Sequence, residues 1–445
     1  MNYRKIAAAV LVVLMAGTAA NGQTMGVLQL NRMDLISTRG AGARPAALGG
    51  AYASISDDAY GLIYNPAGLT QIRKKELTLG IDHVSNDVAL TYDMYTSSLP
   101  FSTTGIGHAS FIYPYPTYRG SLVLGFGVFR MGSADREHFK TAVRNDLGGI
   151  IENRLTQTGS IFQYRLGLGV DVSPRAAIGA NLVIWDQSLE YTEELGFESS
   201  TDLSGYTFTD NTSAGLDGVS LELGLMYRIT PELKFGFKAS SPVWLSIDGD
   251  ASESYVGTYS DGVGWETDPS YVLVEDEYTL PMKFRFGLSY QLFNFLLTAD
   301  AEYCDYSQTK YNGVRMYNEL YPTEDILNEV VDLSAGIEVT LPYYPIKLRG
   351  GYTYMPSRFT GFEEIAYVEE EDLGGGEFEY WVVSEWGQFD VIKERQFFTF
   401  GAGGLIDEVI MLDMAVAIGS LERESEFLNE TIDITEFTAS GSYRF

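Results

Sequence analysis

The sequence predicts an all-β protein, a transmembrane antiparallel β-barrel of about 14 strands with an N-terminal hatch inside its lumen. Three observations predict it. Apolar and polar residues alternate with a period of two along most of the chain. Short turns alternate with long polar connections between the alternating segments. The chain also opens on an apparent export signal.

Residues 1–22 have the features of a secretory signal peptide. Arg4 and Lys5 give it a positive start, the stretch from Ile6 to Met15 is apolar, and small residues precede a cleavage expected before Gln23. The apolar stretch is too short to cross a bilayer as a helix, and no run of about 18 apolar residues follows it. An exported chain of this kind is soluble, peripheral or a membrane β-barrel.

Composition excludes several classes of function. The net charge of −30 would repel nucleic acid. Cys304 is the single cysteine, so the chain can form no internal disulfide, and there are only 3 histidines and no Gly-x-Ser-x-Gly motif. We therefore expect no enzymatic activity, no cofactor and no metal site. The acidic run 369–372 is expected to be solvated, with divalent cations that bridge lipopolysaccharide as the alternative.

The alternation gives each predicted strand one apolar face. From Phe162 to Val172 the even positions are apolar, and from Val219 to Ile229 the odd positions are apolar. Similar patterns predict strands near 75–83, 105–113, 121–130, 160–172, 176–191, 217–229, 233–247, 279–290, 295–306, 331–341, 346–355, 396–405, 409–421 and 431–445.

A soluble sandwich would alternate as well, so the connections decide between the two classes. Tight turns such as 173–175 and 230–232 alternate with long polar loops, predicted at 131–159, 192–216, 248–278, 307–330 and 356–395. An even strand number with short turns at one end and long loops at the other is typical of an outer-membrane barrel. Such a barrel has to close, because the backbone groups of an edge strand would find no hydrogen-bond partner in lipid. The last strand ends on Phe445 and resembles the signal read by the outer-membrane assembly machinery.

Residues 23–74 precede the first strand and do not alternate. Their small residues permit close backbone packing, and their length suits a hatch inside a barrel formed by 75–445. The stretch GARPAALGGAYASISDDAYGLIYNPAGL resembles the N-terminal motif of the FadL family of outer-membrane transporters for hydrophobic compounds. Hairpins such as LGLGVDVSPRAAIGANLVIW are similar to the strand-turn-strand units of that family.

The resemblance implies a barrel with a hatch and sideways exit of a hydrophobic ligand through an opening in the wall. It implies that Asn65, Pro66, Ala67 and Gly68 form the hatch motif at that opening. It also implies an inward bend of the third strand, where Gly125 and Gly127 would allow a kink. The alternative is that these glycines only relieve crowding in the lumen.

Basic residues are scarce, so those expected to face the lumen are candidates for holding a ligand carboxylate. They are Arg165, Lys238, Arg285, Lys347 and Arg349. The alternative is that they pair with acidic residues that also face inward, which are Glu222, Asp300, Glu302 and Glu338.

The expected function is passive uptake of a hydrophobic small molecule, a long-chain fatty acid or a hydrocarbon, across the outer membrane. Trp244, Trp265, Trp381 and Trp386 are candidates for capture, and Trp244 could instead anchor the barrel at the membrane interface. Expected partners are the ligand, outer-membrane lipid and lipopolysaccharide, and the assembly machinery. The alternative is a PorV-like barrel that shuttles secreted proteins of the type IX secretion system. The hatch motif resembles the PorV-like proteins as well, so it does not separate the two functions.

Overall fold

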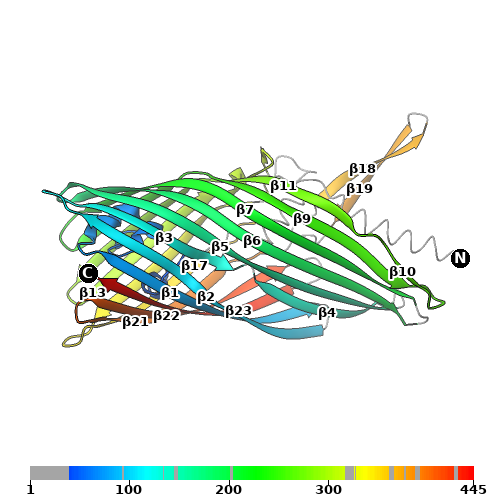
Figure 1. The fold of residues 1–445 in the computed structure, drawn as a ribbon, viewed down its shortest axis with the longest axis horizontal. Helices are drawn as coiled ribbons and strands as arrows, with labels where there is room; N and C mark the ends of the chain where they lie inside the picture. The colour runs from blue at the N-terminus through cyan, green and yellow to red at the C-terminus, as the bar shows by residue number, and fades with distance from the viewer. Residues whose placement is uncertain are drawn as a thin grey trace.

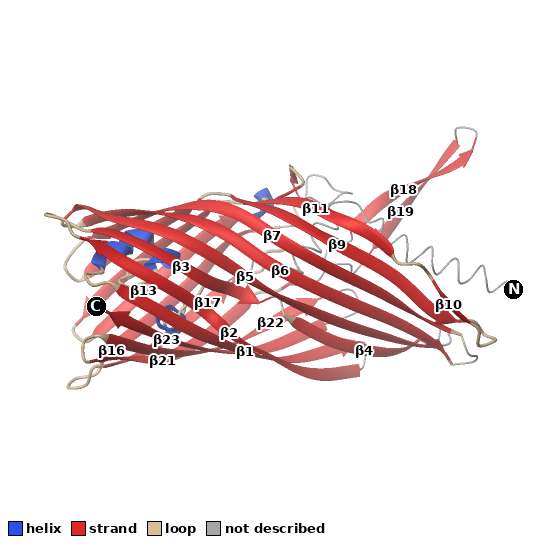
Figure 2. Cartoon of the chain, viewed as in Figure 1, coloured by secondary structure: helices blue, strands red, loops and turns tan. Residues whose placement is uncertain are grey.

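The computed structural model describes residues 40–445 except 93–94, 134, 145–148, 201–203, 316–324, 326, 360–364, 375–376, 386–390 and 425–428. The predicted signal peptide and the start of the predicted hatch lie outside the described residues. In the part that is described, the fold is all-β with a few short helical turns (Figures 1 and 2). No helix of this part is both long and apolar enough to cross a membrane.

The described strands close into a 14-stranded antiparallel barrel, as predicted. Around the ring they are β1 (Glu76–Tyr92), β2 (Tyr95–Tyr115), β3 (Leu122–Ser133), β5 (Gly149–Ser173), β6 (Ala176–Ser199), β7 (Gly205–Arg228), β8 with β9 (Leu233–Ser240 and Val243–Thr258), β12 with β11 (Lys283–Leu292 and Ser270–Leu280), β13 (Phe295–Asp305), β16 (Glu329–Thr340), β17 (Ile346–Met355), β21 (Arg395–Ile406), β22 (Ile410–Glu424) and β23 (Asn429–Arg444). The remaining elements are β4 (Arg136–Arg144), β10 (Gly264–Glu266), β14 (Lys310–Tyr311), β15 (Val314–Arg315), β20 (Val391–Ile392), the separate hairpin β18 (Ile365–Gly374) and β19 (Glu377–Glu385), and the 3-10 turn η2 (Tyr306–Gln308).

The first and last strands close the ring. β1 pairs with β23 from Glu76 opposite Arg444 to Thr91 opposite Asn429. The backbone amides of Lys75 and Phe445 each donate to the other residue's carbonyl, at 3.1 and 3.0 Å, and Arg444 Nε donates to Glu76 Oε2 at 2.7 Å. Closure leaves no edge strand at this junction, which is the condition for a sheet immersed in lipid.

Three predicted loops are wrong, because most of their residues belong to the barrel strands or to short strands paired with them. Residues 131–159, 192–216 and 248–278 lengthen β5, β6, β7, β9 and β11, and add β4. The alternation persists in these extensions with polar residues outside: on β6, Ser188 and Glu190 are exposed while Leu189 and Tyr191 are buried. The predicted strand bounds depend on an apolar outward face, and these extensions lack one. Figure 1 shows them reaching beyond the rest of the barrel, away from the short turns.

Two neighbouring strands break at prolines at the same height. Ser241-Pro242 separates β8 from β9, and Pro281-Met282 separates β12 from β11. The breaks are adjacent, because Lys283 pairs with Ser240 below them and Leu280 pairs with Val243 above them. Proline cannot donate a ladder hydrogen bond, so each break acts as a bulge in the wall.

Each break also moves the apolar stripe of its strand from one face of the wall to the other. Below the break Phe286 and Leu288 lie on the outside, 47% and 49% exposed, whereas Tyr278 and Leu280 above it, also even-numbered, are buried inside. A shift of one residue turns every side chain to the opposite face of a strand. The apolar residues therefore face outward below the prolines and inward above them. The predicted single strands 233–247 and 279–290 are therefore each two strands.

The described N-terminal residues 40–72, here called the N-terminal segment, lie inside the barrel near its short-turn end (Figure 2). The segment contains α3 (Ala43–Ala47), α4 (Gly61–Tyr64) and the 3-10 helix η1 (Pro66–Gln71), nearly all buried. We call the end with the short turns the lower end. The boundaries predicted for the signal peptide, the hatch and the barrel stay a prediction.

Candidate functional site

A buried arginine ties the N-terminal segment to the barrel wall. Arg44 in α3 donates from Nε to Glu338 Oε2 of β16 at 3.2 Å and from Nη1 to Asp58 Oδ2 at 3.2 Å, and it also pairs with Asp57. Burial raises the pKa of Asp58 to about 7, although Arg44 acts to lower it. A second anchor is Asp300 of β13, whose Oδ2 accepts from the backbone amides of Tyr52 and Ala53, both at 2.9 Å.

The Asn-Pro-Ala motif is held against β6 and β7. Asn65 Nδ2 donates to the carbonyls of Ala53 and Leu225 at 2.8 and 3.0 Å, and its Oδ1 accepts from Ala67 N at 3.1 Å, which caps η1. Gly224 lacks the Cβ that would overlap Asn65 Oδ1, so the segment approaches the wall closely. Gly68 lies in the same turn, packed on Ser56. The resemblance implied that this motif lies at the opening of the wall, but its contacts are with intact strands.

The five basic residues proposed to hold a carboxylate already have acidic partners. Arg165 and Lys238 pair with Glu222 at 2.6 and 3.2 Å, Arg285 with Glu302 at 2.7 Å, and Lys347 and Arg349 with Glu338 at 2.7 Å each; Arg349 also pairs with Asp413 at 2.6 Å. The structure agrees with the alternative, in which these basic residues pair with acidic residues that also face the lumen. Arg165 and Lys238 also donate to the carbonyls of Leu62 and Ile63 at 2.6 and 2.7 Å, so they hold the N-terminal segment as well.

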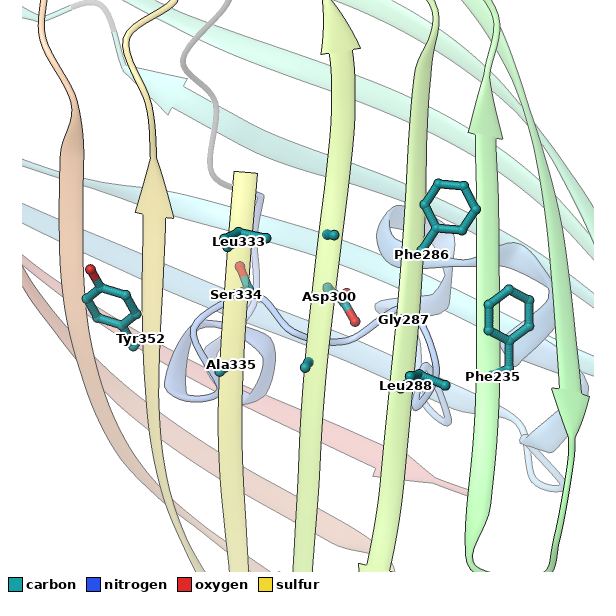
Figure 3. A pocket seen from close by; sticks show the side chains of 11 residues that line it. Phe235, Phe286, Gly287, Leu288, Asp300, Leu333, Ser334, Ala335 and Tyr352 are labelled. Carbon is teal, nitrogen blue, oxygen red and sulfur yellow. The ribbon is translucent and has the colours of Figure 1, made fainter. Parts of the chain in front are cut away.

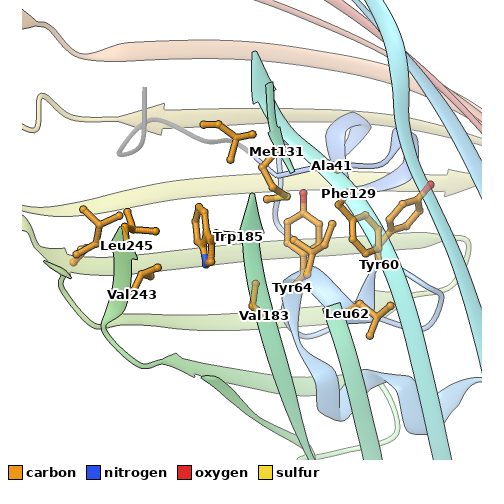
Figure 4. Packing of buried hydrophobic residues seen from close by; sticks show 14 of the residues in the cluster. Ala41, Tyr60, Leu62, Tyr64, Phe129, Met131, Val183, Trp185, Val243 and Leu245 are labelled. Carbon is orange, nitrogen blue, oxygen red and sulfur yellow. The ribbon is translucent and has the colours of Figure 1, made fainter. Parts of the chain in front are cut away.

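Above the N-terminal segment the inward face of the wall is rich in apolar side chains, with a few buried polar ones such as Gln157 and Gln187 among them. Figure 4 shows Trp185, Val243 and Leu245 to the left of Tyr60, Leu62 and Tyr64 of that segment, with Met131 and Val183 between the two groups. In this view the left is the direction away from the lower end. The cluster continues through Leu189, Leu216, Ile247, Tyr278, Leu280, Tyr306, Tyr311 and Phe359. We call these inward residues above the N-terminal segment the upper lumen. A surface of this kind suits an apolar ligand.

Sequence reasoning missed the upper lumen because it assigned a polar lumen to the whole length of every strand. A signal was present on β6, where Leu182 and Ile184 face out and Val183 and Trp185 face in. Apolar residues at consecutive positions indicate a strand with two apolar faces.

The four tryptophans expected in loops are placed differently from one another. Trp244 is 53% exposed on the outside of β9, directly above the proline break, which agrees with an interfacial anchor. Trp265 is in β10, its ring 6.2 Å from that of Tyr259. The side chain of Trp381 and all of Trp386 lie outside the described residues.

The wall is interrupted between β2 and β3. In the described chain their ladder ends at His108 opposite Phe129; above it β2 pairs with β1 alone, and β3 and β4 pair with β5. Both strands carry a bulge at this level, β2 at Gly107 and β3 at Met131. Bulges bend strands and terminate pairing, which explains why the two strands separate here. We call the unpaired stretch above this last pair the wall interruption.

Gly125 and Gly127 lie below the wall interruption, in regularly paired backbone. Gly125 is opposite Ile112 and Gly127 is opposite Ser110. A Cβ on Gly125 would come within 3.0 Å of Leu62 in α4, so this glycine makes room for the N-terminal segment. The irregularity of β3 is at Arg130–Gly132 instead.

A separate hollow of about 520 Å³ lies on the outer face of the wall (Figure 3). Alanines of β13 and β16, among them Ala299, Ala301 and Ala335, form its floor, and Phe286 and Leu333 form parts of its rim. The rim residues belong to the exposed apolar face, so this hollow is not part of the lumen.

No family model matches the sequence, and no curated protein matches it. Solved structures do match the fold. The toluene transporter TodX of Pseudomonas putida superposes with a TM-score of 0.63 at 15% identity, covering 92% of this chain and 99% of that one. The chain has the fold of the TodX and FadL channels.

Two further structures support the same assignment of the fold. The toluene transporter TbuX of Ralstonia pickettii has a TM-score of 0.57 at 14% identity, covering 92% of this chain and 100% of that one. A FadL homologue of Pseudomonas aeruginosa has a TM-score of 0.57 at 13% identity, covering 92% and 99%. The predicted fold, shared with the FadL-type barrels, is thus confirmed.

Proposed function

We propose that the protein is an outer-membrane channel for the passive uptake of hydrophobic small molecules. The observation that carries this proposal is the position of the upper lumen. It ends below on the buried N-terminal segment and includes Met131, which lies two residues past Phe129, the last residue of β3 that pairs with β2. The toluene transporters and the FadL homologue with the same fold support the proposal.

The driving force is the transfer of apolar surface from water. Each Å² of ligand surface buried against the upper lumen contributes about 25 cal/mol, enough for capture without an energy source. The lower lumen is filled by the N-terminal segment and its ion pairs, so straight passage would require their displacement. Exit through the wall interruption into lipid requires no such displacement, because the backbones of β2 and β3 are unpaired there.

The N-terminal segment would act as the hatch, with Asn65, Pro66, Ala67 and Gly68 fixing its position. Bulkier residues in place of Pro66-Ala67 should push η1 away from β6 and change the floor of the upper lumen. We expect slower uptake of a hydrophobic probe at unchanged outer-membrane abundance. Unchanged uptake would remove the gating role of this motif.

Among hydrophobic ligands, the lumen favours neutral hydrocarbons over fatty-acid anions. All five candidate basic residues are engaged by carboxylates, and a ligand carboxylate would have to compete with Glu222, Glu302 or Glu338. Lys283 differs: its Nζ lies 5.4 Å from the ring centre of Tyr306, and no carboxylate of the described chain lies within 4 Å of it. It is the residue to substitute if acids prove to bind better than esters.

The test is entry of the neutral fluorescent probe N-phenyl-1-naphthylamine into cells with a lipopolysaccharide-containing outer membrane. Cells carrying the protein should take up the probe faster than cells carrying an empty vector, and hydrophilic dyes should enter both equally slowly. Equal probe entry would reject the function. No feature of the described chain favours the secretion-shuttle alternative.

A further inference from the structure

One charged side chain lies across the wall interruption. Arg130 follows Phe129, the last residue of β3 that pairs with β2. Its guanidinium packs on Gly105 of β2, where a Cβ would lie 2.9 Å from Nη1. Position 130 shares the outward face of β3 with Phe126, which is 51% exposed, yet the Arg130 side chain is only 10% exposed. Thr104 and Ile106, on either side of Gly105, are exposed on the outside, so Gly105 faces inward, and the guanidinium is buried between the two strands against the inner face of β2.

Arg130 is held from one side only. Nε donates to Ser160 Oγ of β5 at 3.0 Å, and Nη2 lies 3.5 Å from Asp135 Oδ2, between β3 and β4. Asp135 is itself fixed, because its Oδ1 accepts from Gly159 N at 2.9 Å. Toward β2 the structure gives Arg130 packing against Gly105 and, within the described chain, no hydrogen bond. The side chain can thus leave β2 without breaking a bond to it.

The position is costly for a charge. Ile106 beside Gly105 is 71% exposed and apolar, as is Leu124 on β3 at 43%, so the outer surface around Arg130 belongs to the upper edge of the apolar band. Ionisable residues at membrane depth are rare, are paired, and commonly mark function. A residue needed only to fill space between β2 and β3 would be apolar.

We propose that Arg130 is the latch that controls ligand passage through the wall interruption. The proposal rests on the function proposed above and names a residue that determines its rate. In the closed state the guanidinium fills the space between Gly105 and β5. When its bonds to Ser160 and Asp135 break, it swings away from Gly105. No backbone pairing joins β2 to β3 at that level, so a ligand in the upper lumen reaches lipid.

The test uses the probe-entry assay with variants present at equal outer-membrane abundance. Arg130→Ala removes the latch together with its hydrogen bonds to a charged group, and should speed probe entry roughly tenfold. Gly105→Ala keeps the charge but adds a methyl group where the guanidinium lies, and should speed entry to a similar extent. Ser160→Ala should give a smaller increase. Arg228→Ala, an exposed arginine at the lower end, is the matched control and should change nothing.

The outcomes separate the two proposals. If wild-type protein does not speed probe entry over empty vector, the proposed function fails. If wild type conducts and both Arg130→Ala and Gly105→Ala enter at the wild-type rate or more slowly, the latch is overturned. If Arg130→Ala fails to insert into the membrane, Gly105→Ala and Ser160→Ala are compared with wild type, because both retain the arginine. Faster probe entry in these two variants supports the latch, and entry at the wild-type rate or more slowly overturns it.

Discussion

The two halves of the lumen are built on different chemistry. The lower half contains the N-terminal segment and ion pairs such as Arg44 with Glu338 and Arg165 with Glu222, so its buried charges are neutralised in place. The upper half has side chains such as Trp185 and Leu245 on its inward face. The charges of this barrel anchor the N-terminal segment, whereas its apolar inward residues would contact the proposed hydrophobic ligand. Changes in each half should therefore have separable consequences.

The largest expected effect is on anchoring. Arg44→Ala leaves Glu338, Asp57 and Asp58 without their buried cation, and breaking such a pair costs about 3–5 kcal/mol. We expect the N-terminal segment to become accessible to protease in folded barrels, measured by mass spectrometry of the fragments. Arg175→Ala, in an exposed turn, is the control. A segment that stays protected in Arg44→Ala would show that other contacts suffice to anchor it.

A smaller effect is expected on ligand binding. Trp185→Ala removes a large apolar side chain from the upper lumen and should weaken binding of a neutral aromatic probe by about 1.5–3 kcal/mol, or roughly 10- to 100-fold. Trp244→Ala removes the same side chain from the outer face and should leave the Kd unchanged. Fluorescence titration of the purified protein measures both. Equal losses in the two variants would place the binding surface outside the lumen.

The pH dependence of anchoring should be weaker still, and its sign follows from Asp58. Its pKa is raised to about 7 from an ordinary value near 4, so the folded state holds a proton that the unfolded state releases. The stabilising contribution is fully present below about pH 4 and is lost as pH rises through about 7. Unfolding midpoints should fall between pH 5 and pH 8, and Asp58→Asn should flatten this slope. A wild-type midpoint that rises over that range would contradict the assignment.

The smallest effect is expected for ligand charge. A long-chain fatty acid should bind no better than its methyl ester, and Lys347→Ala with Arg349→Ala should not change the ratio of their affinities, because both cations are already paired with Glu338. Isothermal titration with the acid and the ester measures this ratio. An acid preference that the double substitution abolishes would restore these residues as a carboxylate site.

The class of fold was predictable because alternation, turn spacing and closure are local or nearly local signals. Strand number followed from short turns such as 173–175 and 230–232, which the structure retains. The pairing of lumen charges was predictable as an alternative, since inward acids and bases were both visible in the pattern. These features depend on the identity of residues along single strands.

The remainder depends on neighbouring strands. Pro242 and Pro281 are about 40 positions apart in sequence, and only the ladder shows that their breaks lie side by side. Without that pairing, the sequence does not predict that Leu245 and Tyr278 face inward. For the same reason it does not predict the upper lumen, to which both residues belong. The alternation of apolar and polar residues does not reveal the bulges at Gly107 and Met131 either. The kink of the third strand was therefore predicted at Gly125 and Gly127, whereas the irregularity of β3 lies at Met131.

The pairing of β1 with β23 has a consequence for how this protein is assembled. The N-terminal segment precedes β1 in the chain, yet it bonds to Leu225, Asp300 and Glu338, which are synthesised much later. Its partners do not exist as a surface until the sheet has curled around it. A nascent chain that ends before β23 therefore has two open edges and an unenclosed N-terminal segment. When β23 pairs with β1, the barrel closes and the N-terminal segment is enclosed at the same time. Truncation at the C-terminus should therefore impair the packing of the N-terminal segment.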